Sequence, residues 1–171
     1  LSKSLLPEIK DFEKGDYCAY FGSYLGNYYL VLMFPSFWSY ELFETSLETK
    51  GTTTDYESFT GRKSYAENCV GGYYTVRLAV AEKLKEIKKQ NAILVLRFIS
   101  NEYTLPLGVW VTREASRKTL LKKPIKFASK ELMLTYSKNL INKKFGFDIS
   151  DILQQSLLLK GLKQRMLESY A

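Results

Sequence analysis

Two cations and two glycines lie close together in the chain, followed by aromatic residues that can stack on a base. Arg62 and Lys63 precede the pair Gly71-Gly72, and Tyr74 comes shortly after it. Free N–H groups at the start of a helix attract anions, so two cations beside them would favour a phosphate. A tyrosine stacked on a base contributes about 1 to 3 kcal/mol in single-strand binders. The grouping predicts a nucleic-acid or phosphate site.

The glycine pair has two interpretations. Each glycine inside a helix lowers the stability of that helix by about 1 kcal/mol relative to alanine. A group packed closely against the glycine backbone must compensate for this loss. Either a neighbouring strand or helix packs where a Cβ would collide, or a ligand lies against the bare backbone. Each neighbour also has an ordinary role: Arg62 and Lys63 as solvated charges, Glu67 as half of a capping box.

Further basic residues extend the candidate site. Arg113 and Arg117 are four residues apart in a predicted helix and therefore share a face. Arg97 lies inside an apolar stretch and needs a partner, for which Glu102 or Glu114 are candidates. The predicted nucleic-acid or phosphate-binding residues are Arg62, Lys63, Asn68, Gly71, Gly72, Tyr74, Arg77, Arg113 and Arg117.

The chain contains no histidine, which excludes several kinds of active site. Ser-His and Cys-His nucleophile pairs and His-ligated metals are impossible. Cys18 and Cys69 are too far apart for a C-x-x-C motif, so we expect no disulfide framework, no metal site and no cofactor. Catalytic residues remain unknown. An enzyme acting on a nucleotide or phosphodiester would depend on the carboxylates and basic or phenolic groups that remain: Glu67, Glu102, Glu114, Tyr65 and Lys63.

Composition and charge favour a single globular domain with an anionic partner. The chain has 171 residues, 46% of them hydrophobic and 25% charged, with a net charge of +7. A charge of this sign favours polyanions such as DNA. No apolar run reaches the 18 residues of a membrane span, so no membrane association is expected. The chain begins with Leu1 and has no signal peptide, and we expect an intracellular domain of a longer protein.

The periodicity of the sequence predicts a single α+β domain over residues 1–160. A small, at least partly antiparallel sheet of three or four strands would pack against three or four helices. Ser64 and Glu67 form a capping box that would start a helix of about seven turns. Residues 1–16 and 48–54 look irregular, 39–47 fits strand or helix, and 101–108 looks like a loop. The other predicted elements are two short strands within 17–34, the second near 28–34, and strands at 91–100 and around 125–127. Helices are predicted at 109–121 and from about 129 to 144, the latter closed by Gly146, and a last helix beginning at Asp148 or Ser150 is interrupted by Gly161.

The last eight residues, "QRMLESYA", match three of the four key positions of a sliding-clamp interaction box. The box has a Gln first, an aliphatic residue fourth and aromatic residues seventh and eighth. Gln164, Leu167 and Tyr170 fit, whereas Ala171 departs from the pattern. Such a box docks as one turn of 3₁₀ helix carrying a hydrophobic plug. Residues 161–171 are therefore predicted to be a flexible tail that binds the sliding clamp (PCNA).

Most of the chain resembles the C-terminal domain of the archaeal Nre family. The resemblance lies in "GRKSYAEN" at 61–68, "GGYY" at 71–74 and "GVW" at 108–110. Family members are regarded as DNA-repair proteins with a clamp-binding box at the C-terminus and zinc-finger cysteines in an N-terminal part. The resemblance therefore implies a repair role in the archaeal cytoplasm, on chromosomal DNA, and assigns the clamp contact to Gln164, Leu167 and Tyr170. It implies no catalytic residues.

We expect a DNA-repair accessory domain that binds DNA or a nucleotide near the glycine pair and docks on the sliding clamp. The alternatives are the enzyme described above and a structural adaptor whose glycines serve packing. The surroundings of Arg62, Tyr74 and the glycines distinguish them: an open basic groove favours DNA binding, a pocket lined by carboxylates an enzyme, and a filled contact an adaptor.

Overall fold

The computed structural model describes residues 2–102 and 108–171. Most of the predicted loop at 101–108 lies outside the described residues. The helices are α1 (Ser2–Lys10), α2 (Val70–Ile87), α3 (Val109–Leu121), α4 (Lys130–Phe145), α5 (Ser150–Gln155) and α6 (Leu157–Ser169), and the strands are β1 (Tyr17–Tyr24), β2 (Asn27–Phe34), β3 (Ser39–Ser46), β4 (Thr52–Glu57), β5 (Ala92–Ile99) and β6 (Ile125–Phe127).

The six strands of the described residues form one mixed sheet in the order β4-β3-β5-β2-β1-β6. β1 and β2 form a hairpin whose turn residues, Leu25 and Gly26, both have positive φ, as tight hairpin turns require. β5 pairs antiparallel with β2 and parallel with β3, and the other pairs are antiparallel. β5 therefore lies inside the sheet, which agrees with its continuous apolar sequence.

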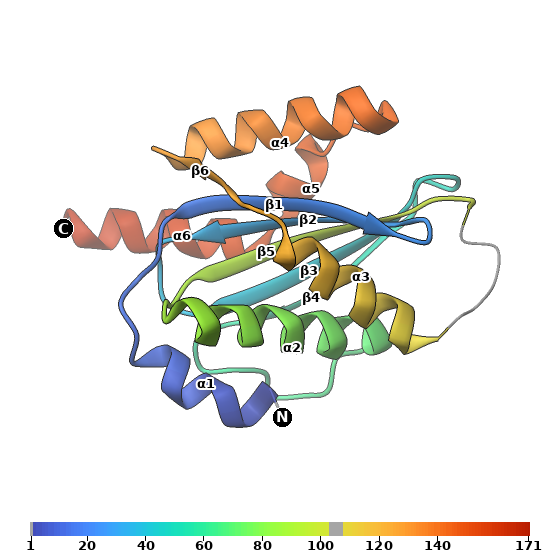
Figure 1. The fold of residues 1–171 in the computed structure, drawn as a ribbon. Helices are drawn as coiled ribbons and strands as arrows, with labels where there is room; N and C mark the ends of the chain where they lie inside the picture. The colour runs from blue at the N-terminus through green and yellow to red at the C-terminus, as the bar shows by residue number, and fades with distance from the viewer. Residues whose placement is uncertain (1, 103–107) are drawn as a thin grey trace.

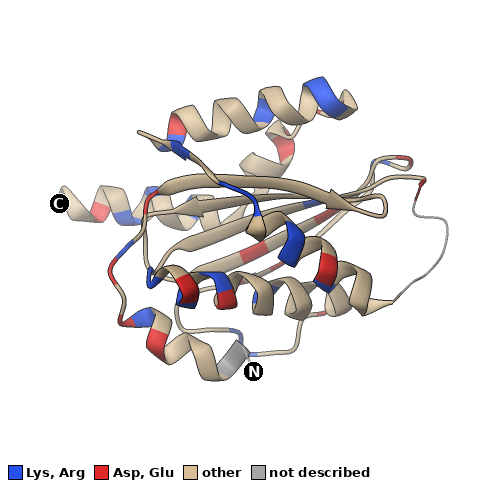
Figure 2. Ribbon diagram, in the orientation of Figure 1, with Lys and Arg blue, Asp and Glu red and all other residues tan. Residues whose placement is uncertain are grey.

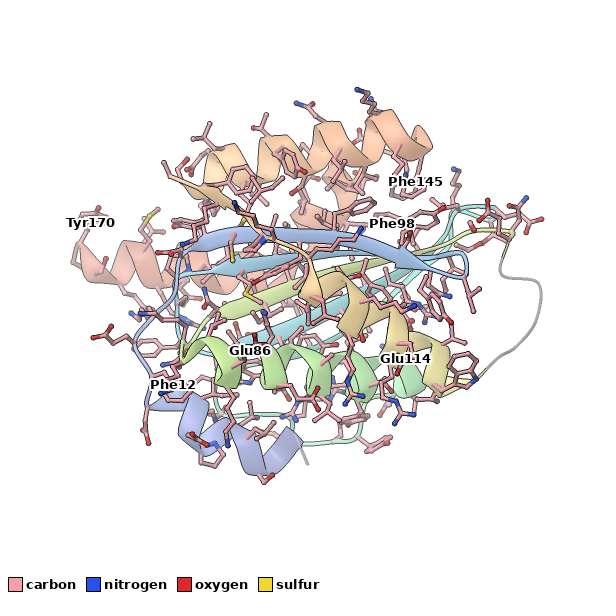
Figure 3. The ribbon with its side chains drawn as sticks, viewed as in Figure 1. Phe12, Glu86, Phe98, Glu114, Phe145 and Tyr170 are labelled. Atoms are coloured by element: carbon pink, nitrogen blue, oxygen red, sulfur yellow. The ribbon has the colours of Figure 1, made fainter. Side chains whose placement is uncertain are left out.

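The sheet is the middle of three layers (Figure 1). Helices α1, α2 and α3 cover one face, and α4, α5 and α6 cover the other. Successive strand residues face opposite layers, so Val31 belongs to the first core and Leu32 to the second. Between β5 and α4, the rings of Phe98 and Phe145 lie 5.6 Å apart (Figure 3). None of the described helices is long and apolar enough to cross a bilayer.

The α+β class and the single domain are confirmed, and several predicted elements have their predicted bounds. α3 and β6 span the predicted residues, and α4 lies one residue further along the chain than the predicted 129–144. Ser129 accepts the N–H of Leu132 at the start of α4, and Gly146 adopts the left-handed conformation at its end. Gly146 thus closes α4 as predicted, and Ser129 caps the start of this helix.

The described residues contain more elements than the three or four strands and three or four helices predicted. The ambiguous stretch at 39–47 forms β3, and part of the predicted loop at 48–54 belongs to β4. Residues 2–10 form α1 although Pro7 lies within it, because Leu6 and Ile9 are buried in the core against α2. Tertiary packing outweighed local propensity in each case.

The last helix is continuous, so the predicted interruption at Gly161 is wrong. α6 runs from Leu157 to Ser169, and nothing lies within 4 Å of the Cβ position of Gly161. Gly161 therefore occupies an open helix surface and makes no turn. The structure shows residues 161–169 as helix, and the flexibility of this segment in solution stays a prediction.

Both cysteines are buried and unpaired. Burial raises the pKa of the Cys18 thiol to about 11 and that of the Cys69 thiol to about 12. The thiols are therefore protonated at neutral pH, and neither has the thiolate character of a reactive cysteine.

A buried carboxylate joins the start of α6 to strand β3 of the sheet. Glu41 in β3 accepts hydrogen bonds from the Ser156 hydroxyl and from the backbone N–H groups of Leu157 and Leu158, the latter two at 3.1 Å. Burial raises the pKa of Glu41 above its ordinary 4.5, while the same hydrogen bonds act in the opposite direction. The N-terminus of α6 thus supplies hydrogen-bond donors to a carboxylate whose charged form burial would otherwise disfavour.

We predict that the contribution of Glu41 to stability decreases as the pH rises above 4.5. Because its pKa is higher in the folded state than in the unfolded state, the folded state binds more protons in that window. The free energy of unfolding of the wild type, relative to Glu41→Gln, should therefore fall as the pH rises. Urea unfolding of both proteins over a pH series measures this difference, and a difference independent of pH would contradict it.

Candidate DNA-binding site

Helix α2 begins later than the sequence predicts, and its start is held by a carboxylate from the sheet. The helix starts at Val70, with Cys69 at the N-cap position and no side-chain cap from it, so the capping box predicted at Ser64 is wrong. The carboxylate of Asp55 in β4 accepts the backbone N–H groups of Asn68 at 2.9 Å and Cys69 at 2.6 Å. A residue distant in sequence thus satisfies donors near the helix start.

Arg62 fixes the connection between β4 and α2. Its guanidinium donates to the backbone carbonyl groups of Tyr56 at 2.9 Å, Ser64 at 3.1 Å and Tyr65 at 3.2 Å. It also pairs with Asp55 at 3.3 Å. With its donors committed to the protein itself, Arg62 holds the shape of the connection, and Asp55 offsets its positive charge.

The glycine pair lies in the first turn of α2, against the sheet and α3. A Cβ on Gly72 would lie 2.7 Å from Oε2 of Glu44, whereas one on Gly71 would meet only Cγ2 of Val109 at 3.6 Å. Glu44 is ion-paired with Arg97, so its carboxylate is not free to move. Close packing against β3 therefore explains Gly72, and this is the packing interpretation raised by the sequence.

Arg97 has an internal ion pair, as expected, but with different partners from the predicted Glu102 and Glu114. Its guanidinium pairs with Glu44 and donates from Nε to the Asn27 side chain at 2.9 Å. Glu44, Asn27 and Arg97 come from the neighbouring strands β3, β2 and β5. Strand register brought them together, and the sequence alone did not reveal that register.

A cavity of about 720 Å³ opens between α1, the β4–α2 connection and α2. Its size is in the range of small-molecule and nucleotide sites. Among the side chains that the structure describes, four cations line it, together with two tyrosines and one carboxylate. These residues are Lys10, Arg62, Lys63, Arg77, Tyr65, Tyr74 and Glu57.

The carboxylate in this cavity is already neutralised. Glu57 at the end of β4 is buried, and its Oε1 accepts from Nε of Arg77 at 2.8 Å and from Nε1 of Trp38 at 3.0 Å. Glu57 and Trp38 were not among the predicted site residues. Asp55 and Glu57 are two residues apart, a spacing that places both on one face of a strand, but no strand was predicted at 55–57.

The tyrosines of the cavity form a stack. The rings of Tyr65 and Tyr74 lie 4.5 Å apart with an interplanar angle of 30°, and the Tyr74 hydroxyl accepts the N–H of Ala66 at 3.0 Å. Tyr65 is 65% exposed, so the outer face of its ring is free to receive a planar group. Tyr73 belongs instead to the buried core.

The other predicted site residues lie away from this cavity or have other partners. Neither glycine is among the described lining residues, and the Asn68 side chain donates to the Thr54 carbonyl at 3.0 Å. On α3, Arg117 pairs with Glu82 at 2.9 Å, and Arg113 is exposed. The structure thus brings together only four of the predicted residues: Arg62, Lys63, Tyr74 and Arg77.

The carboxylates of the enzyme hypothesis do not meet in the cavity. Glu67, Glu102 and Glu114 are absent from its described lining. Within residues 2–102 and 108–171, no group of three or more potential ligands could hold a metal ion. Figure 2 shows basic and acidic segments interspersed on the helices of both layers, so the net charge of +7 is not confined to one helix.

The clamp-box residues lie on the last turns of α6. Gln164 and Leu167 are exposed on this helix, and Tyr170, at its C-cap, is 85% exposed (Figure 3). The Gln164 amide donates to Glu168 at 3.4 Å. The segment is α-helical here, whereas the predicted docked form is a 3₁₀ turn.

Comparison with known proteins identifies one family and several relatives. Residues 57–170 match the family model described as archaeal Nre, C-terminal. The chain is 36% identical over 98% of its length to DNA repair protein NreB of Archaeoglobus fulgidus, covering 44% of that protein. It is 34% identical to DNA repair protein NreA of A. fulgidus, over 71% of this chain and 32% of that protein. It is also 34% identical to DNA repair protein NreA of Haloferax volcanii, over 57% of this chain and 26% of that protein. The chain spans less than half the length of each relative. No solved structure matches it.

We predict opposite effects of alanine at the two adjacent glycines. Gly72→Ala should lower the free energy of unfolding by about 1 to 3 kcal/mol, because the new Cβ displaces the Glu44 carboxylate from Arg97. Gly71→Ala is the matched control and should raise it by about 0.5 to 1 kcal/mol, because alanine is the better helix residue and the site has room. Urea unfolding measures both. Equal effects would show that contact with Glu44 is not what requires glycine.

Proposed function

The chain belongs to the archaeal Nre family, and from this membership we propose that it is part of a DNA-repair protein. In this proposal the basic cavity beside α1 binds DNA or a nucleotide, and the end of α6 docks on the replication sliding clamp (PCNA). The protein would act in the archaeal cytoplasm, on chromosomal DNA.

The observation that carries the DNA-binding proposal is the lining of the cavity. The described lining carries Lys10, Arg62, Lys63 and Arg77. Arg77 is paired with Glu57 and Arg62 with Asp55, so the excess positive charge comes from Lys10 and Lys63. A hollow with this excess of positive charge attracts phosphate, and its low-dielectric walls strengthen that attraction. The exposed face of Tyr65 adds a surface on which a base can stack.

Lys63 and Arg62 have different roles in this site. Lys63 is exposed, so its ammonium is available to a phosphate. Arg62 donates to three backbone carbonyl groups, so its main effect is to hold Lys63 and Tyr65 in position. Glu57, the one carboxylate in the described lining, is hydrogen-bonded to Arg77 and Trp38. We therefore propose a binding role for the cavity.

The clamp-docking proposal is supported by the exposure of the box residues. Gln164, Leu167 and Tyr170 lie at the accessible end of α6, where a partner can reach them without opening the core. The buried part of the helix lies at its other end, where Leu158 packs in the core. Local unwinding after Gly161 would give the box its 3₁₀ form and leave the anchored first turn in place.

We predict that Lys63→Ala weakens DNA binding and reduces its dependence on salt. Loss of one phosphate contact should lower the slope of log affinity against log salt by about 0.9 for duplex or 0.7 for single strands. Lys138→Ala is the matched control, because Lys138 is exposed on α4, on the opposite face of the sheet. Fluorescence anisotropy with a labelled oligonucleotide at several salt concentrations measures the slopes. Equal slopes for both variants would contradict the cavity as the binding site.

We predict that Gln164→Ala combined with Tyr170→Ala weakens binding to an archaeal sliding clamp at least tenfold, as expected when hot-spot residues are truncated. Lys163→Ala, at an exposed neighbouring position outside the box pattern, should have little effect. Calorimetric titration of the clamp measures both. Undiminished binding by the double variant would refute the assigned contact.

A further inference from the structure

Two exposed phenylalanines and two lysines form a surface ridge next to the basic cavity. Phe37, in the β2–β3 connection, is 46% exposed, and Phe59, in the β4–α2 connection, is 37% exposed. Their rings lie 5.7 Å apart in an edge-to-face arrangement. The ammonium of Lys10 lies 4.5 Å from the Phe59 ring centroid, and that of Lys14 lies 4.3 Å from the Phe37 centroid. These four residues are called the aromatic-lysine ridge.

The ridge differs from the scattered apolar residues that any surface carries. Single exposed phenylalanines are ordinary, but here residues from three separate segments of the chain converge. Among the described residues, Lys10 and Lys14 have no ion-pair partner, and each ammonium instead lies over an aromatic ring. Such a contact stabilises by only about 0.5 to 1 kcal/mol at an exposed site, so a phosphate can readily draw the lysine away.

The ridge continues the basic cavity across the surface. Lys10 lines that cavity and also lies over Phe59, which contacts Phe37. On the far side, Lys14 and Phe37 line a second hollow of about 670 Å³. Cations outnumber carboxylates in this second lining, with Lys14, Lys130 and Arg165 against Glu131 and Glu168. Lysines and aromatic rings therefore follow one another from the first hollow to the second.

We propose that the aromatic-lysine ridge is a second contact for DNA and that it selects single strands. An unpaired base stacks on Phe59 or Phe37, and the phosphates on either side pair with Lys10 and Lys14. Aromatic rings for stacking with cations beside them are the general design of single-strand binding surfaces. A duplex lacks free base faces, because its bases are stacked on one another, so it would gain only the lysine contacts. This inference rests on the proposed DNA binding of the cavity. It adds a preference for single strands and places the bound strand along the surface from the cavity across the ridge.

The direct test compares single-stranded and duplex DNA on ridge variants of the chain. The probes are a labelled oligothymidylate of about 16 nucleotides, a length within the range of single-strand sites, and a labelled blunt duplex of the same length. Phe37→Ala combined with Phe59→Ala should weaken single-strand binding about tenfold to a hundredfold, the equivalent of one lost base stack. Duplex binding should stay unchanged.

Control variants separate stacking from folding and from the cavity. Phe37→Trp combined with Phe59→Trp keeps aromatic faces and should retain single-strand binding. Leu132→Ala, an exposed apolar residue on α4, should change neither probe. Lys63→Ala, in the cavity, should weaken both probes. Thermal unfolding of each variant checks that the fold is intact.

The possible results distinguish the two proposals. Single-strand binding that survives Phe37→Ala with Phe59→Ala but falls with Lys63→Ala overturns the ridge and leaves the cavity in place. An equal loss for both probes also overturns the ridge, because a stacking surface cannot act on a closed duplex. Absence of DNA binding by the wild type would refute the cavity proposal and the ridge with it.

Discussion

The carboxylate of Asp55 holds the connection between β4 and α2, and the basic cavity takes its shape from that connection. Asp55 accepts the N–H groups of Asn68 and Cys69 and pairs with Arg62, which in turn binds three backbone carbonyl groups of the same segment. The residues from Ser58 to Cys69 belong to no helix or strand, and apart from the Ser58–Gly61 bridge their order depends on these contacts, which offset the conformational entropy lost on folding. A charge buried at the edge of the sheet thus orders a surface on which Lys63 and Tyr65 can be presented together.

The elements that the sequence predicted well are those whose signals are local. The glycine at 146 adjoins the helix that it ends, and the apolar run of β5 lies within the strand that it specifies. β4 and the start of α2 were predicted incorrectly, because their determinants come from elsewhere in the chain. Ser64 and Glu67 have the pattern of a capping box, but Asp55 in the neighbouring strand satisfies the donors near the helix start. Whether a nearby or a distant side chain accepts these N–H groups is decided by tertiary structure.

The sequence predicted only those residues of the candidate site that lie close together in the chain. Arg62, Lys63, Tyr74 and Arg77 belong to one connection and the helix after it, so the sequence places them close together, and the structure gathers them around one cavity. Lys10 and Glu57 enter that cavity from α1 and β4, and neither was predicted. Gly72 faces Glu44 in β3, a contact set by the position of the helix on the sheet. The resemblance to the archaeal Nre family, based on "GRKSYAEN" and "GGYY", is confirmed.

The two buried thiols make the chain convenient for spectroscopy. Maleimides and spin labels react with thiolates, and burial keeps Cys18 and Cys69 protonated and out of reach. A single cysteine introduced on the surface can therefore carry a fluorophore or nitroxide while both native cysteines remain in place. Distances from the end of α6 to the rest of the domain then become measurable without altering the core.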